Sequence, residues 1–80
     1  MSIALHILSP EGTLVRAHVS LVSLPGIVSP FTVLPGHAPL ITALEEGTVR
    51  YVEDGTEKGL RIREGFVRVG NDQVTVCAEL

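Results

Sequence analysis

The sequence predicts an all-β fold in which two sheets form a small, flattened sandwich. Twenty-two of the 80 residues are Val, Ile or Thr, whose branched side chains suit a pleated sheet and restrict helix rotamers. Eight glycines and five prolines divide the chain into pieces too short for helices of ordinary length. In several of these pieces apolar side chains recur at every second position, which is the period of a strand.

The N-terminal part is expected to hold two strands. Ile3, Leu5 and Ile7 share one parity and so belong to one sheet face. The run Ser9-Pro10-Glu11-Gly12 predicts the turn that follows. The next strand is expected to separate apolar from polar side chains, with Val15, Ala17, Val19 and Leu21 on one face opposite Arg16, His18 and Ser20.

The segment from Leu24 to Gly47 contains four of the five prolines, at positions 25, 30, 35 and 39. Because proline has no backbone N–H to give to a neighbouring strand, central strands exclude it. We therefore expect edge strands and rigid loops in this segment. One of these strands is the apolar run Leu40–Leu44, which ends at Glu45-Glu46-Gly47.

The C-terminal part is expected to alternate strands with short turns. Leu60 and Ile62 alternate with arginines, and a later run places Val67 and Val69 opposite Phe66 and Arg68. Turns are expected at Glu53-Asp54-Gly55, at Arg63-Glu64-Gly65 and at Gly70-Asn71-Asp72. The last of these lies between two valine runs and predicts a tight hairpin. Residues 74–80 are the final strand, and no C-terminal helix follows it.

The composition excludes several classes of protein. Eighty residues allow one small domain, so residues 1–80 are expected to form one. A hydrophobic share of 45% against 19% charged residues excludes a disordered tail, and a net charge of −3 argues against binding to nucleic-acid phosphates. A single cysteine excludes a small disulfide scaffold and favours a reducing compartment. The sequence shows neither a membrane-spanning apolar run nor a signal peptide.

The titratable residues show no spacing typical of a catalytic or metal site. His6, His18 and His37 lack the spacing of a metal-binding pair, and the first two are expected as outward strand residues. His37 stands between Pro35 and Pro39, which favours a specific contact over a solvated loop residue. Cys77 is expected as a buried or half-buried structural thiol.

The other polar runs fit solvated surfaces better than chemical sites. Glu45-Glu46 would point to opposite faces in a strand, so a solvated turn is favoured over a carboxylate pair. The glycines form no phosphate-binding loop. Arg61, Arg63 and Arg68 would make a basic stripe for a partner if they shared one face, but nearby acidic turns favour a solvated face. The residues alone therefore predict a binding module, with no cofactor, no metal and no visible active site.

One stretch of the chain resembles a known family closely. Residues 34–47 read LPGHAPLITALEEG and are similar to the hallmark run of the N-terminal β-sandwich domain of the F-type ATP synthase epsilon subunit, called delta in mitochondria. Residues 3–12 and 60–77 resemble the family's opening and close. The loop from Pro25 to Val33 departs from the family's usual glycine and acidic pattern and keeps only Gly26. The resemblance covers essentially the whole chain.

This resemblance implies a sandwich of about ten short strands and a non-catalytic role. The family's subunit rides on the central stalk, links the gamma subunit to the ring of c subunits, and helps to couple proton transport to ATP synthesis. The resemblance implies a gamma-subunit interface that includes Ser9, His37, Ala38, Pro39 and Thr42. It implies a c-ring interface that includes Ser29, Pro30 and Phe31.

The resemblance also implies where the subunit is located in the cell and which family segment this chain is expected to lack. The complex would hold this subunit at the cytoplasmic face of the bacterial inner membrane, as a peripheral component. Most members continue into a C-terminal helical hairpin that can inhibit ATP hydrolysis and in some members binds ATP. This chain has no such hairpin, so we expect a short form without that inhibition or that ATP site.

Two other functions stay open at this point. A free-standing sandwich could bind a small ligand or a polysaccharide, but the chain has only three aromatic residues to line a pocket, Phe31, Tyr51 and Phe66. An enzyme could use His37 as its base, but no second catalytic residue stands at a suggestive spacing.

Overall fold

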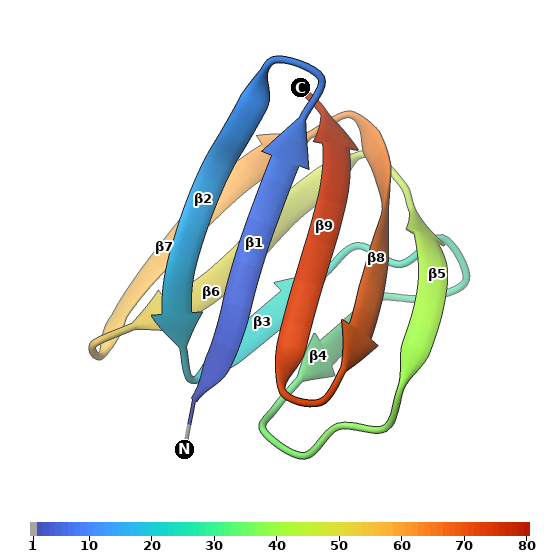
Figure 1. The fold of residues 1–80 in the computed structure, drawn as a ribbon. Coiled ribbons are helices and arrows are strands. Elements are labelled where there is room, and N and C mark those ends of the chain that lie inside the picture. Colours follow the sequence, from blue (N-terminus) through green and yellow to red (C-terminus); the bar gives the residue numbers. More distant parts are fainter. Residues whose placement is uncertain (1) are drawn as a thin grey trace.

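The computed structural model describes residues 2–80 as two β-sheets that pack face to face (Figure 1). The first sheet has five strands in the order β2-β1-β9-β8-β5. Their bounds are β1 Ile3–Ser9, β2 Gly12–Val19, β5 Leu40–Leu44, β8 Glu64–Gly70 and β9 Gln73–Glu79. β1 pairs with β9 in parallel, and the other pairs are antiparallel. The first and last strands of the chain therefore lie side by side in the middle of this sheet.

The second sheet has four strands in the order β4-β3-β6-β7. Their bounds are β3 Leu21–Leu24, β4 Phe31–Val33, β6 Gly47–Glu53 and β7 Thr56–Ile62. Residues 2–80 thus form nine strands where about ten were expected, and the predicted all-β sandwich is confirmed. Every regular element in this part of the chain is a strand, so it has no helix long and apolar enough to cross a membrane.

The core lies between the two sheets and follows the predicted alternation. Sixteen hydrophobic side chains of residues 2–80 are buried there, including those of Ile3, Leu5 and Ile7 on β1 and of Val74 and Val76 on β9. No polar or charged side chain of residues 2–80 is buried. The core is therefore held by apolar contact, and the charged side chains of these residues keep contact with solvent.

The alternation predicted for the second strand ends at Ser20. Within β2 it holds, because Val19 is buried and Arg16 is exposed. The chain then passes to the second sheet, where Val22 is buried and Leu21 is half-buried on the outer side. The prediction that Leu21 shares a face with Val19 is wrong, because the period of two holds only within one continuous strand.

The proline-rich segment forms edges of both sheets, as predicted. β4 is the outermost strand of the second sheet and β5 is the outermost strand of the first. The loop after β3 lies against β5, where the N–H of Ile27 donates to the carbonyl oxygen of Ala43 at 3.0 Å. The N–H of Glu45 donates to the carbonyl oxygen of Pro25 at 2.9 Å. These bonds occupy backbone groups that an edge strand would otherwise leave open.

The tight turns use residues with positive φ. Asn71 and Asp72 have φ of 52° and 56°, which is the two-residue hairpin geometry predicted between β8 and β9. Asp54, with φ of 51°, helps to close the β6–β7 hairpin. The run Arg63-Glu64-Gly65 is not a turn of this kind. A bend at Arg63 alone leads the chain from β7 in one sheet to β8 in the other.

Candidate functional site

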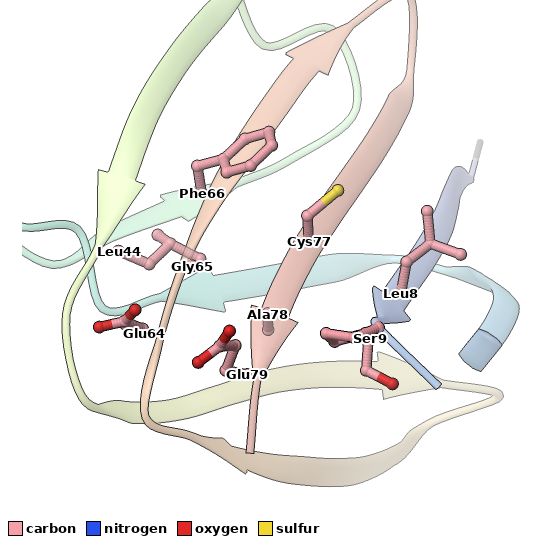
Figure 2. A pocket seen from close by; sticks show the side chains of 10 residues that line it. Leu8, Ser9, Leu44, Glu64, Gly65, Phe66, Cys77, Ala78 and Glu79 are labelled. Atoms are coloured by element: carbon pink, nitrogen blue, oxygen red, sulfur yellow. The ribbon is translucent and has the colours of Figure 1, made fainter. Parts of the chain in front are cut away.

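The outer face of the five-stranded sheet carries a continuous apolar row. Its members are neighbours in register across four strands: Ala43 on β5, Phe66 on β8, Cys77 on β9 and Leu8 on β1. Phe66 is 53% exposed and Ile41, also on this face, is 71% exposed. Figure 2 shows Phe66, Cys77 and Leu8 on three adjacent strands. A row of this kind on an otherwise polar surface is typical of a protein–protein contact.

Charged side chains lie on either side of the apolar row. Towards one end of the strands Glu64 and Glu79 face each other across β8 and β9, and we call them the acidic row. Towards the other end Arg68, Thr75, His6 and Arg16 are neighbours in register, and we call them the basic row. The outer face is thus ordered from acidic through apolar to basic along the strand direction.

A groove of about 730 Å³ runs over the acidic end of this face (Figure 2). Phe66, Cys77 and Leu8 of the apolar row line it together with Ser9 and Pro10 of the β1–β2 turn. Glu64 and Glu79 supply its acidic side. The groove is open and mostly apolar, so it suits a protruding side chain or backbone segment of a protein partner.

The predicted gamma-interface residues lie at both ends of this face. Ser9 ends β1, and its Oγ accepts a hydrogen bond from the N–H of Glu11 at 3.2 Å. The other end holds His37, Ala38 and Pro39, beside the start of β1 and the β8–β9 turn. There the N–H of Ala4 donates a hydrogen bond to the carbonyl oxygen of Asp72. Ser9 and the His37 loop therefore frame the outer face and do not touch each other.

The His37 loop is fixed to the β8–β9 hairpin. A carboxylate oxygen of Asp72 accepts a hydrogen bond from the N–H of Gly36 at 2.7 Å. The ring of His37 is half-buried, and its Nδ1 donates to the carbonyl oxygen of Ala38 at 2.7 Å. Gly36 has φ of 85°, a conformation that glycine adopts without strain. The loop is thus held in place by its neighbours.

The side chain of Thr42 lies on the opposite face of β5 from the apolar row. In β5 the side chains of Leu40, Thr42 and Leu44 turn towards the core, and Ile41 and Ala43 turn outwards. Thr42 is half-buried at the edge of the sandwich. Neither Ile41 nor Phe66 was among the predicted interface residues, although Val67 and Phe66 were expected on opposite faces of one strand.

The predicted c-ring residues lie on the loop that leads into β4. Ser29 and Pro30 are exposed, and Phe31 is half-buried. The ring of Phe31 packs over Gly26, where a Cβ atom would come within 2.9 Å of Phe31 Cδ1. Phe31 therefore holds the loop in shape, and Ser29 and Pro30 are the members free to meet a partner.

The remaining titratable groups form no chemical site among residues 2–80. No three His, Cys, Asp or Glu residues lie close enough together there to hold a metal ion. Arg61 pairs with Glu46 at 3.6 Å and Arg63 with Glu79 at 3.2 Å, while Arg68 lies on the other sheet from Arg61. The three arginines therefore make no common stripe. The carboxylate of Glu53 raises the pKa of Lys58 through a hydrogen bond of 2.9 Å.

By contrast, no large hydrophobic side chain among residues 2–80 is exposed on the strands of the second sheet. Arg50 lies in register with Ser23 on one side and Gly59 on the other, and Ser23 shares a hydrogen bond of 3.2 Å with Thr32. This face has no exposed aromatic side chain. The two outer faces thus differ in chemistry, and only the five-stranded one resembles a docking surface.

Comparison with known proteins gives one consistent family. A family model described as the β-sandwich domain of the ATP synthase delta/epsilon chain matches residues 2–80. The ATP synthase epsilon chain of Lawsonia intracellularis is 41% identical over 78 residues, 98% of this chain and 59% of that protein. The epsilon chain of Paracoccus denitrificans is 42% identical over 74 residues, 91% of this chain and 50% of that protein. The chain thus spans 50–59% of the length of these two relatives.

Solved structures share the fold. A chain of the mitochondrial ATP synthase of Euglena gracilis, in a complex of OSCP, F1 and c-ring, superposes with a TM-score of 0.89 at 20% identity. The match covers 96% of this chain and 50% of that one. A chain of the central stalk and c-ring of the Tetrahymena thermophila enzyme gives a TM-score of 0.83 at 8% identity, over 100% of this chain and 65% of that one. At these identities the likeness concerns the fold alone.

Proposed function

Because the chain belongs to the family of ATP synthase delta/epsilon β-sandwich domains, we propose that it serves as a non-catalytic part of the enzyme's central stalk. In this role it links the gamma subunit to the c-ring and helps to couple proton transport to ATP synthesis. It sits on the cytoplasmic face of a bacterial inner membrane, as a peripheral component of the complex. Two bacterial relatives named epsilon chains support this proposal.

The apolar row is the observation that carries the proposal. Phe66 is more than half exposed on a rigid sheet, and Leu8, Ala43 and Cys77 continue the same surface. Each Å² of apolar surface removed from water contributes about 25 cal/mol, so covering such a row favours association with a partner. Among residues 2–80 no three His, Cys, Asp or Glu side chains gather into a metal-binding set, and the exposed apolar row suits a docking element.

The gamma subunit is proposed to cover this face. Ser9 at one end and His37, Ala38 and Pro39 at the other mark the two ends of the docking surface. Thr42 lies at its β5 edge, half-buried, and acts there by shaping the edge. Because the His37 loop is already fixed by hydrogen bonds, little conformational entropy is lost when it meets the partner.

The c-ring is proposed to meet the loop before β4. Ser29 and Pro30 are exposed at its tip, and Phe31 anchors it over Gly26. Backbone hydrogen bonds at Pro25 and Ile27 connect the same loop to β5. The loop is thus tied to both sheets, which lets a push on its tip reach the whole sandwich.

The first test replaces Phe66 by aspartate. Phe66→Asp places a charge in the middle of the apolar row, so we expect the affinity for the gamma subunit of the same organism to fall by at least about thirtyfold. The affinity is measured by isothermal titration calorimetry. Since Phe66 is 53% exposed, the melting temperature should change little.

The matched control is Val28→Asp. Val28 is 91% exposed and lies on the loop before β4, outside the four strands that carry the apolar row. It should bind gamma as the unmodified chain does. Equal affinities for the Phe66→Asp variant and this control would contradict the proposed docking face, and no binding by the unmodified chain would contradict the proposed role itself.

A further inference from the structure

Two arginines on the docking face have no carboxylate partner among residues 2–80. The ion pairs of this part of the chain are Lys58–Glu53, Arg61–Glu46 and Arg63–Glu79. Arg16 and Arg68 take part in none of them, and both are exposed. Their positive charge is therefore available to a group from outside the chain.

The sheet aligns these two cations in one row. Arg68 is opposite Thr75, Thr75 is opposite His6, and His6 is opposite Arg16. The two arginines stand three strands apart, which is about 14 Å at the usual strand spacing. Nε2 of His6 lies 3.5 Å from Nη2 of Arg16 and 3.3 Å from Oγ1 of Thr13. The imidazole thus holds the guanidinium of Arg16 in the row.

The other end of the same face is acidic. Glu64 and Glu79 are directly opposite each other, and Arg63 offsets only the second of them. The acidic row lies four residues along β8 from Arg68, which is about 14 Å at 3.4 Å per residue. Charges are screened within about 8 Å at physiological ionic strength, so the two rows act on a partner separately.

We propose that this charge order fixes the direction in which the gamma subunit docks. The inference rests on the proposed function and adds the chemistry of the partner surface. That surface has an apolar ridge over Phe66, carboxylates opposite Arg68 and Arg16, and a basic group opposite Glu64. Rotated by half a turn, the same surface would set like charges against each other, which disfavours the reversed orientation.

The opposite sheet supports a specific role for the basic row. Arg50 on β6 is exposed and has no carboxylate partner in residues 2–80 either, but it stands among Ser23, Thr32 and Gly59. Its apolar neighbours on this face, Leu21 and Val52, are half-buried, and no second cation of residues 2–80 lies in register with it. A single solvated arginine of this kind contributes little to recognition.

The test compares charge reversals on the two faces. We expect Arg68→Glu to weaken gamma binding by about tenfold or more and Arg50→Glu to leave it within about twofold. For the unmodified chain we expect the affinity to fall when salt is raised from 50 to 300 mM. For the double variant Arg16→Glu with Arg68→Glu, the same change in salt should lower the affinity much less. Circular dichroism melts show that each variant is folded.

A reciprocal exchange identifies the partner's carboxylate. One Asp or Glu replaced by Arg on the facing surface of gamma should restore binding to the Arg68→Glu variant. If the Arg68→Glu and Arg50→Glu variants bind alike while Phe66→Asp does not bind, the docking face stands and the charge order is wrong. If the Phe66→Asp variant binds as well, the docking face itself is wrong.

Discussion

At the scale of single residues, Asp72 forms the β8–β9 turn and also connects it by hydrogen bonds to two other segments. It adopts φ of 56° in the β8–β9 hairpin, and its carboxylate accepts the N–H of Gly36 at 2.7 Å. Its carbonyl oxygen accepts the N–H of Ala4 at 2.9 Å. One residue therefore ties the hairpin to β1 and to the loop that carries His37. The position of the His37 loop depends on this link, whose two partners, Gly36 and Asp72, are 36 positions apart in the sequence.

Replacing Asp72 separates its two contributions. Asp72→Ala removes the hydrogen bond to Gly36 and puts a strained residue at positive φ, so we expect the free energy of unfolding to fall by about 1–3 kcal/mol. Asp72→Asn keeps an acceptor oxygen and tolerates the same φ, so it should cost less than about 1 kcal/mol. Urea denaturation measures both values. If Asp72→Asn lost as much stability as Asp72→Ala, the proposed contributions of the acceptor oxygen and of the backbone conformation would be contradicted.

At the scale of elements, the corner between the sheets depends on close strand contact. β8 begins directly after the bend at Arg63, and Gly65 lies opposite Ala78 of β9 and Leu44 of β5. A Cβ atom at Gly65 would meet the carbonyl oxygen of Cys77 and lie 3.0 Å from Cα of Ala78. Glycine lets β8 approach β9 here, at the floor of the groove beside the apolar row.

Gly65→Ala is expected to destabilise the chain by at least about 2 kcal/mol, because strand backbones must move apart to admit the methyl group. Gly59→Ala is the control. Gly59 also lies in a strand, but its Cβ would meet a side-chain methyl, that of Thr48, at 3.1 Å. We expect a change within about 1 kcal/mol there. Chemical denaturation measures the free energy of unfolding of both variants. If Gly65→Ala left it unchanged, the proposed close contact between β8 and β9 would be contradicted.

At the scale of the whole molecule, stability comes from one thin apolar core. Val76 on β9 is fully buried, between Ile7 on β1 and Val67 on β8. No buried charge or unsatisfied polar side-chain atom opposes it in residues 2–80. A domain of 80 residues has about 4–12 kcal/mol of net stability, so a single core truncation removes a large share.

Val76→Ala should therefore lower the free energy of unfolding by about 2–3 kcal/mol, with a clear fall in melting temperature. Val52→Ala, on the half-buried outer side of the second sheet, should cost less than about 1 kcal/mol. Differential scanning calorimetry measures both. A Val52→Ala variant as unstable as Val76→Ala would show that the second sheet's outer face is also part of the stabilising core.

Four features could be predicted from the sequence: the all-β class, the alternation of side chains in β1, β8 and β9, the Asn71-Asp72 hairpin and the family resemblance. These features are local, since the period of two and the turn residues act within a few positions. That Leu8 and Cys77 are neighbours could be seen only in the folded chain, because the parallel pairing of β1 with β9 joins residues 69 positions apart. The folded chain also shows where the alternation of inward and outward side chains is interrupted. This happens at Ser20 and Arg63, where the chain passes from one sheet to the other. The apolar row and its two charged flanks therefore exist only once the strands have been set in order, since alternation gives each side chain a face but not a neighbour.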